Sequence, residues 1–274
     1  MSYATLLVYV NFDHASKQLV GVAADLADKF SSKLIGLSAL AMPPPAAAEG
    51  AVILDNGAEF DIAQMKAKIE QAGNKFRAAA GSARQAEWRS FLEFPTETLI
   101  REARCADLIV VEKNRASWNI HKVADNGSAI LGAGRPFLVV PAAVKSLAAD
   151  HIVIGWKDTR EARRAVQDAL PFLRGAKRVT IVEICEMDQM ESARHRIDDV
   201  AGYLVQHKIK AKPRVEVQSL GSTAADQIIG LAMDEEVDLL ITGAYGHSRL
   251  NEWVFGGMTR DLLTSSPICC LMSH

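Results

Sequence analysis

The stretch that decides the fold is Leu239-Leu240-Ile241-Thr242, which runs into Gly243-Ala244-Tyr245-Gly246 and, nine residues later, into Gly256-Gly257-Met258-Thr259. The first, largely apolar run predicts a buried strand, and the second glycine pair precedes a predicted helix over 259–265. Glycines let the backbone approach an anion closely, and free N–H groups at a turn and at a helix start point toward it. The spacing therefore predicts a phosphate-binding turn.

This stretch belongs to the second copy of an internal repeat. Asp107-Leu-Ile-Val-Val and the later Pro136-Phe-Leu-Val-Val match Asp238-Leu-Leu-Ile-Thr and Pro267-Ile-Cys-Cys-Leu, with the same spacing in both halves. Each half also opens on a strand-like run followed by a helical pattern, over 15–30 in the first half and 160–173 in the second. The chain therefore repeats one strand and helix design.

The repeat predicts an α/β fold built as two tandem open sandwiches. Continuous Val, Ile and Leu runs indicate strands that are buried on both faces, and their alternation with helices indicates a mostly parallel five-stranded sheet in each half, with helices on both faces. We place the halves at residues 1–145 and 148–274. A proline-rich insert near 42–60 has no counterpart in the second half, and a helix over 62–80 follows it.

The motif Gly243-x2-Gly246-x9-Gly256-Gly257-x-Thr259 resembles the nucleotide signature of the universal stress protein family. The resemblance covers nearly the whole chain and implies an adenine-nucleotide α-hydrolase-like fold. It also implies a bound adenine nucleotide, ATP or else AMP or ADP, with Mg²⁺ left open. The family usually has Ser or Thr where this chain has Gly257, so only the backbone N–H of that residue could contact phosphate.

A second departure from the family lies after the first strand of the second half. Family members that bind nucleotides usually carry there an Asp that contacts the ribose or adenine side, and the matching residue is Lys157, which cannot accept a hydrogen bond. Lys157 could add positive charge near phosphates or be solvated, and Asp158 could substitute. The predicted nucleotide-binding residues are Gly243, Gly246, Arg249, Gly256, Gly257, Thr259, Trp156 and Lys157.

Several of these residues have an alternative interpretation that involves no ligand. Arg249 could reach over phosphates or lie in a solvated loop, and Trp156 could wall an adenine pocket or plug an empty crevice. Glu161, Arg163 and Arg164 follow helical spacing and are expected on an exposed helix face.

The first half carries side chains where the second half has glycines. Glu112 aligns with Gly243, Arg115 with Gly246, and Asp125 with Gly256, and further on Asn126 replaces the second glycine of the pair and Ser128 matches Thr259. Acidic side chains at 112 and 125 would repel phosphate. We therefore expect no phosphate site in the first half, and expect residues 126–128 to cap the following helix.

Composition limits the classes of function. The chain has 274 residues, of which 49% are hydrophobic and 23% charged, and a net charge of −2, which argues against nucleic acid or an anionic membrane as partner. We expect no membrane span, no signal peptide and reduced cysteines, hence a cytoplasmic protein. No nucleophile elbow, Walker loop or metal-ligand cluster is present in the sequence.

The sequence thus favours a stress-response protein that binds ATP or a related nucleotide in its second half and lacks strong catalytic activity. A slow ATPase remains open. The alternative is a nucleotide-free scaffold that binds a protein or a small apolar ligand. The resemblance further implies that the last strands, 136–141 and 267–272, join the halves into an internal pseudo-dimer, which could associate into a homodimer.

Overall fold

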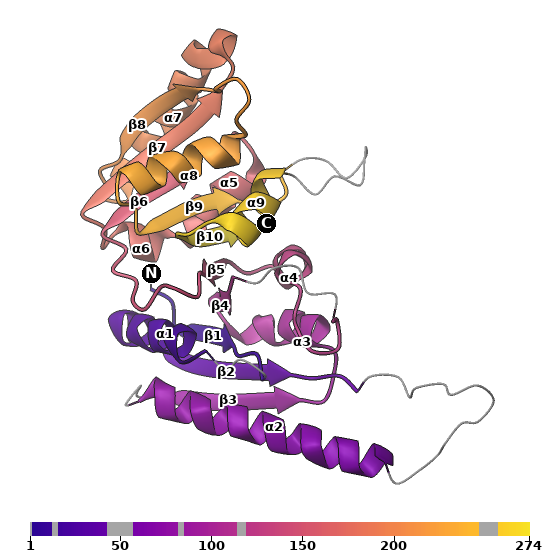
Figure 1. Cartoon of the computed structure of the whole chain (residues 1–274). Coiled ribbons are helices and arrows are strands. Elements are labelled where there is room, and N and C mark those ends of the chain that lie inside the picture. Colours follow the sequence, from indigo (N-terminus) through magenta and orange to yellow (C-terminus); the bar gives the residue numbers. More distant parts are fainter. Residues whose placement is uncertain (1, 13–15, 43–56, 82–84, 114–118, 247–256) are drawn as a thin grey trace, which may run out of the picture.

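The computed structural model describes residues 2–12, 16–42, 57–81, 85–113, 119–246 and 257–274, with only the backbone of residues 57–61 (Figure 1). The first half contains β1 (Thr5–Tyr9), α1 (Lys17–Phe30), β2 (Lys33–Ala39), α2 (Gly57–Ala80), β3 (Ala86–Phe91), α3 (Pro95–Glu102), η1 (Ala103–Cys105), β4 (Leu108–Glu112), α4 (Asn126–Ala133) and β5 (Phe137–Val140). The second half contains β6 (His151–Gly155), α5 (Arg160–Asp168), α6 (Leu170–Leu173), β7 (Arg178–Cys185), η2 (Met187–Gln189), α7 (Met190–Gln206), β8 (Lys212–Val217), α8 (Ala224–Asp234), β9 (Leu239–Gly243), α9 (Gly257–Ser265) and β10 (Cys269–Ser273).

The strands form one ten-stranded sheet in the order β3-β2-β1-β4-β5-β10-β9-β6-β7-β8. Neighbouring strands are parallel within each half, and β5 and β10 are antiparallel to each other, with Leu138 opposite Leu271. The predicted parallel sheets and the pairing of the halves along their last strands are confirmed. The domain boundary at residues 145–148, in the link between β5 and β6, remains a prediction.

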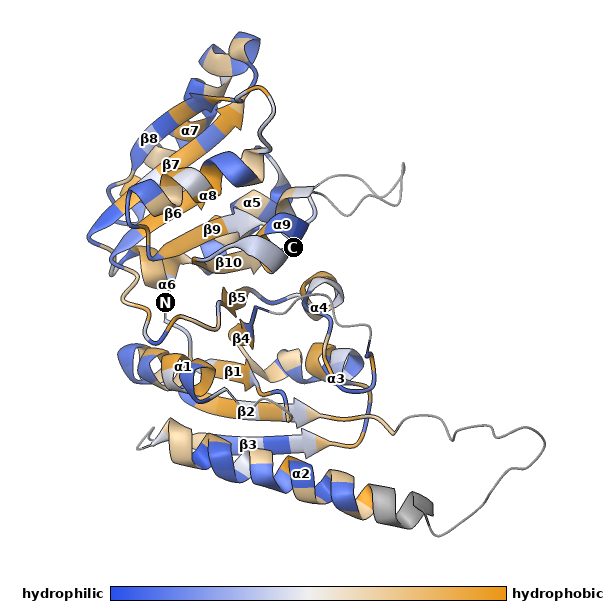
Figure 2. Cartoon of the chain, in the orientation of Figure 1, coloured by the Kyte–Doolittle hydropathy of each residue, from blue (hydrophilic) through white to orange (hydrophobic). Residues whose placement is uncertain are grey.

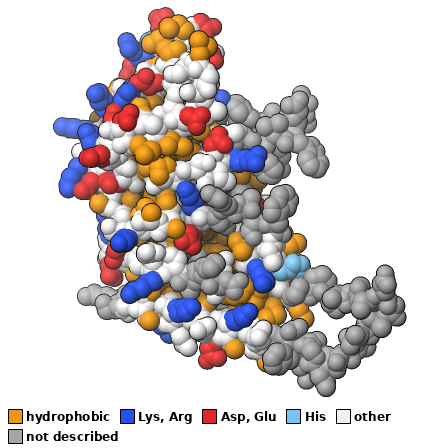
Figure 3. All heavy atoms as spheres, in the orientation of Figure 1, with side chains coloured by type: hydrophobic (Ala, Val, Ile, Leu, Met, Phe, Trp, Pro, Cys, Tyr) orange, Lys and Arg blue, Asp and Glu red, His pale blue; other side chains and the backbone are white. Residues whose placement is uncertain are grey.

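Helices cover both faces of the sheet, and each face is shared by the two halves. Helices α1, α2, α5, α6 and α7 pack on one face, while α3, α4, α8 and α9 pack on the other. The central strands are buried along nearly their whole length, which agrees with their apolar runs (Figure 2). Lysine and arginine side chains are intermingled with acidic ones on the face that Figure 3 shows.

The aspartates that lead the repeated strands have one structural role in both halves. Asp107 Oδ2 accepts hydrogen bonds from two backbone N–H groups at the start of β1, at 2.7 and 3.0 Å. Asp238 Oδ2 does the same at the start of β6, at 2.7 and 2.9 Å. A carboxylate is a strong acceptor for backbone donors. The repeated Asp therefore fixes the amino ends of adjacent parallel strands, away from the predicted ligand edge.

Side chains also connect the halves outside the sheet. The rings of Tyr3 and Phe30 meet that of Phe172 with centroids 5.7 and 5.0 Å away, and the Tyr3 hydroxyl donates to the Asp168 carbonyl at 2.6 Å. Lys113 Nζ donates to the Ser266 carbonyl at 2.8 Å. These contacts and the β5–β10 pairing make the two halves one packed unit.

Helices α1 and α9 begin at Lys17 and Gly257, close to their predicted starts at 15 and 259, and two other helices differ more from their predicted bounds. The helix expected over 160–173 is divided at Ala169 into α5 and α6, because Pro171 lacks the N–H that a continuous helix needs there. Helix α2 begins at Gly57 and not near residue 62, so it includes the end of the predicted insert. The proline run at 43–45 lies outside the described residues.

Candidate functional site

The predicted phosphate turn, Gly243–Gly246, lies at the carboxyl end of β9, and we call it the glycine turn. Strand β9 pairs with β6 and packs against α5 (Figure 1). A Cβ atom on Gly243 would lie 2.6 Å from the Ala162 nitrogen and 2.7 Å from the Glu161 carbonyl carbon. Backbone atoms cannot yield at such distances. The glycine at 243 is thus required by the packing of α5, and this requirement is independent of any ligand.

Gly246 faces the same helix start less tightly. A Cβ atom there would meet Thr159 Oγ1 at 3.2 Å and Glu161 Oε2 at 3.3 Å. Glu161 is only 4% exposed, so the prediction that it lies on an exposed helix face is wrong. Helical spacing could not reveal this, because Glu161 is in the first turn of α5, beside the glycine turn, and not on the outer face that Arg163 occupies.

The Glu161 carboxyl is ionised at neutral pH. Burial raises its pKa, but hydrogen bonds from Arg160, from its own backbone and from Thr159 outweigh that effect and hold the pKa below the ordinary value. Arg160 is its ion-pair partner, and the guanidinium side of that pair is mostly exposed. A negative charge therefore lies within the predicted site, which sequence reasoning did not anticipate.

Helix α9 begins at Gly257, beyond the glycine turn. Among the described residues, the nearest side-chain atom to a Cβ on Gly257 would be Asp261 Oδ2 at 3.9 Å, so packing against these residues does not require a glycine here. Within the described part of the chain, no side chain accepts a hydrogen bond from the N–H groups of Gly257 or Met258. The first N–H groups of a helix have no partner inside the helix. The start of α9 therefore offers donors to an anion.

Thr259 is predicted to contact the nucleotide, and in the structure its side chain contacts the glycine turn. Its side chain is 5% exposed, and its Oγ1 accepts a hydrogen bond from the Tyr245 backbone N–H at 3.1 Å. The hydroxyl thus ties the glycine turn to α9. Its own proton remains able to donate, because a hydroxyl is both donor and acceptor.

Tyr245 connects the glycine turn with the first half. Its φ of 60° is left-handed, a conformation that is uncommon outside glycine. Its hydroxyl lies 2.5 Å from where a Cβ on Gly127 of α4 would be. Burial and then the charge of Asp125 raise the pKa of Tyr245 to about 12. Sequence reasoning missed this contact, because residues 127 and 245 are far apart in the chain.

The residues predicted after β6 are only partly near the turn. Trp156 is 8% exposed and packs in the core on the α5 side of the sheet, and its indole Nε1 has no hydrogen-bond partner among the described residues. Lys157 is exposed. Asp158, the suggested substitute for the missing acceptor, is also exposed and bonds Arg163 at 2.6 Å. Asp158 is thus occupied at the surface.

Two predicted site residues, Arg249 and Gly256, lie outside the described residues, as does Arg115 of the first half. Within the described ranges, no group of three or more His, Cys, Asp or Glu side chains could hold a metal ion. Among the helices that the structure describes, none combines the length and apolarity needed to cross a membrane.

The corresponding region of the first half is closed by its own side chains. Asp125, the N-cap of α4, accepts a hydrogen bond from the Ser128 N–H at 2.7 Å. Asn126, 3% exposed, donates to the Glu112 carbonyl at 3.0 Å. The helix is indeed capped, but the capping residue is Asp125 and not a member of 126–128, because only the residue before the first turn can reach those donors.

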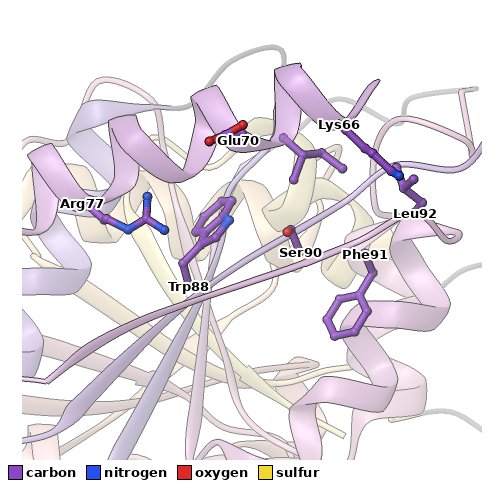
Figure 4. A pocket seen from close by; sticks show the side chains of 8 residues that line it. Lys66, Glu70, Arg77, Trp88, Ser90, Phe91 and Leu92 are labelled. Carbon is purple, nitrogen blue, oxygen red and sulfur yellow. The ribbon is translucent and has the colours of Figure 1, made fainter. Parts of the chain in front are cut away.

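The described residues also form a cavity elsewhere. A groove of 340 Å³ lies between α2 and β3 and is lined by Lys66, Ile69, Glu70, Arg77, Trp88, Ser90, Phe91 and Leu92 (Figure 4). Trp88 packs against Phe76, with ring centroids 5.3 Å apart, and beneath Gly73, where a Cβ would lie 2.8 Å from the indole nitrogen. None of the predicted nucleotide-binding residues lines this groove.

Comparison with known proteins identifies the family that the second half resembles. Residues 150–274 match the model of the universal stress protein family. The second half of this chain belongs to that family. Among curated proteins, none matches the sequence. The match covers β6 to β10, and therefore the glycine turn and α9.

Solved structures resemble the whole length of this chain. A universal stress protein from Archaeoglobus fulgidus DSM 4304 has a TM-score of 0.72 at 14% identity, with 98% of this chain and 95% of that chain covered. A putative universal stress protein from Pseudomonas aeruginosa UCBPP-PA14 has a TM-score of 0.55 at 12% identity, covering 99% and 93%. A protein of unknown function from Pseudomonas aeruginosa PAO1 has a TM-score of 0.55 at 11% identity, covering 99% and 92%. At such identities the likeness establishes the tandem universal stress protein fold and leaves the ligand open.

Proposed function

We propose that the second half binds ATP or a related adenine nucleotide, with the phosphates at the start of α9 and the glycine turn beside them. The observation that carries the proposal is the start of α9, where Gly257 is open and the first N–H groups have no side-chain acceptor among the described residues. The membership of the second half in the universal stress protein family supports an adenine nucleotide as the anion.

The proposed role is binding and not turnover, in a protein of the stress response. Within the described residues, Glu161 is the one ionised and buried carboxylate beside the glycine turn, and no cluster of metal ligands is present there. Phosphoryl transfer usually needs a metal held by carboxylates. Phosphate release with and without Mg²⁺ tests this part: release that depends on Mg²⁺ and is lost in a site variant would make the protein an ATPase.

The first experiment measures the nucleotide content of the purified, denatured protein, together with calorimetric titration by ATP. We expect one adenine nucleotide per chain. Two per chain would place a second site in the first half, against the capping of α4 by Asp125. No binding at millimolar ATP would contradict the proposal.

A pair of substitutions at one position then tests the donors. Gly257→Pro removes a backbone N–H but suits the first position of a helix, where proline is favoured. Gly257→Ala keeps the N–H and adds a methyl group where there is room. We expect Ala to leave the affinity unchanged and Pro to weaken binding by about tenfold, the usual effect of losing a hydrogen bond to a charged group. Equal affinities in the two variants would remove α9 from the site.

The second candidate function is binding of a small apolar ligand without any nucleotide, and the groove between α2 and β3 favours it. Ile69 and Trp88 supply apolar walls, as expected of small-molecule sites. Fluorescence of Trp88, read as the difference between the wild type and Trp88→Phe, would respond to an apolar probe. A response in protein that binds no ATP would favour this function.

We further propose that the chain, already an internal pseudo-dimer, forms a homodimer through another surface, because β5 and β10 already pair with each other. Light scattering that gives the mass of a single chain would contradict this part of the proposal.

A further inference from the structure

The buried carboxylate of Glu161 determines how a nucleotide can lie in the proposed site. Its Cβ would lie 2.9 Å from a Cβ on Gly243, and its Oε2 would lie 3.3 Å from a Cβ on Gly246. Both glycines of the turn therefore face this one side chain. A ligand that lies over Gly246 is therefore close to the Glu161 carboxylate.

The charge of Glu161 is paired with a cation that lies mostly in solvent. Arg160 is its ion-pair partner, and 78% of the Arg160 side chain is exposed, so water screens much of its charge. Like charges at short range repel, and the repulsion increases as water is excluded. A phosphate group is therefore disfavoured directly against Glu161.

A carboxylate is by contrast a good partner for hydroxyl groups. When ionised it only accepts hydrogen bonds, and its two oxygens can accept them from two neighbouring hydroxyls. Acidic side chains take this role for the ribose in other nucleotide-binding α/β folds. The other carboxylate close in sequence, Asp158, is exposed, whereas the Glu161 carboxylate lies beside Gly246. Glu161 is therefore the better placed acceptor for a sugar.

The two ends of the site thus differ in sign. The start of α9 offers N–H donors that have no side-chain acceptor among the described residues, and the positive end of a helix dipole, which favour phosphate. The Tyr245 N–H to Thr259 Oγ1 bond joins that helix to the glycine turn, so the donors and the carboxylate flank one turn. A ligand with an anionic end and a neutral hydroxyl-bearing part fits this arrangement in one direction.

We propose that Glu161 accepts hydrogen bonds from the ribose hydroxyls of the nucleotide, so that the sugar lies over Gly246 and the phosphates lie at Gly257. The inference rests on the proposed nucleotide function and adds to it the residue that selects ribose over deoxyribose. Glu161 then makes up for the acceptor that Lys157 cannot supply.

The test is calorimetric titration of the full chain with ATP, 2′-deoxy-ATP, 3′-deoxy-ATP and inorganic triphosphate, which has no sugar. We expect the wild type to bind ATP about tenfold or more tightly than at least one deoxy analogue, since each charge-assisted hydrogen bond has an effect of that order. Glu161→Gln should reduce the preference for ribose at least several-fold, while inorganic triphosphate binds equally to both proteins. Asp158→Asn, a loss of the same charge at an exposed position, is the matched control and should keep the preference.

Three results would overturn the inference in different ways. Equal affinities for ATP and both deoxy analogues would show that no residue of the proposed site recognises the ribose hydroxyls. Tighter binding of ATP and inorganic triphosphate by Glu161→Gln, with the ribose preference unchanged, would place Glu161 against the phosphates. Absence of binding by all four ligands would instead refute the nucleotide function on which the inference rests.

Discussion

The turns that follow β4 and β9 occupy equivalent positions in the two halves. The helices that follow these turns nevertheless begin differently, because α4 has a side-chain cap and α9 has none among the described residues. In the first half, the Asp125 carboxylate accepts from the Ser128 N–H in the first turn of α4, and the Asn126 side chain donates to the Glu112 carbonyl. In the second half, Gly257 stands at the start of α9 with room around it and no described side-chain cap. One half caps its helix with its own carboxylate, and in the other half no described side chain does so.

This comparison teaches that a repeated fold can keep its framework while the residues at the carboxyl ends of its strands diverge. The framework residues are alike, as with Asp107 and Asp238. The residues at the carboxyl ends of the strands are not. The first half contributes instead to the contact between the halves, where Gly127 of α4 meets Tyr245 of the glycine turn.

The largest expected effect is at the equivalent pair Gly243 and Glu112. Gly243→Val would drive a side chain into the backbone of α5 and should lower the free energy of unfolding by about 3 kcal/mol, as severe overpacking does. Glu112→Val, where a side chain already exists, should cost less than about 1 kcal/mol. Urea unfolding of both variants measures the difference. Equal losses would mean that the two turns pack alike after all.

The second-largest effect should be a loss of folding stability that is equal in the two halves. Asp107→Ala and Asp238→Ala each leave two backbone N–H groups without their carboxylate, and each should cost about 2 kcal/mol. The same unfolding measurement applies, with nucleotide affinity as a second readout that should not change, because both residues lie at the opposite edge of the sheet. Clearly different losses of unfolding free energy in the two variants would show that the two aspartates do not play the same structural role.

A smaller effect is expected where the two turns meet. Gly127→Ala places a methyl group against the Tyr245 hydroxyl and should cost about 1 kcal/mol, although alanine by itself favours a helix. In a Tyr245→Phe background the same change should be neutral or stabilising. A double-mutant cycle therefore gives a coupling energy of about 1 kcal/mol. Additive effects of the two changes would show that the residues do not touch.

The smallest effect should be a loss of folding stability that appears only at alkaline pH. The pKa of Tyr245 is raised from 10.0 to about 12, because burial and the charge of Asp125 disfavour the phenolate. A group with a raised pKa in the folded state contributes stability below pH 10, and this contribution is lost as the pH rises toward 12. The loss should stay under about 1 kcal/mol, since Tyr245 is only partly buried and water screens its charge.

The measurement is the pH dependence of unfolding in the wild type and in Tyr245→Phe. The difference between the two proteins isolates this phenol from the other tyrosines. Parallel curves for both proteins between pH 10 and 12 would contradict the predicted shift.

The sequence alone predicts much of the framework. Apolar runs and the repeated Asp and Pro positions identify the central strands, and the shared spacing identifies the two halves. These signals are local, so they do not depend on the partners that the chain later brings together. The predicted bounds of a helix are wrong where a single residue interrupts it, as Pro171 interrupts the helix predicted over 160–173.

The site is predicted less completely. The sequence locates the glycine turn and the start of α9, but it treats all four glycines as ligand contacts. In the structure Gly243 is needed for the packing of α5, whereas Gly257 is open. Spacing cannot separate the two, because the reason for each glycine is a neighbour from another part of the chain.

What the sequence by itself determined is therefore the α/β framework and its duplication, and it also predicts where an anion would bind. Only the tertiary structure decided that Asp125 caps α4, that Glu161 is buried beside the glycine turn, and that Tyr245 reaches Gly127. Strands and turns follow from short-range patterns of apolar residues and glycine. Burial, charge pairing and close approach depend on distant segments, and they exist only once the sheet has assembled.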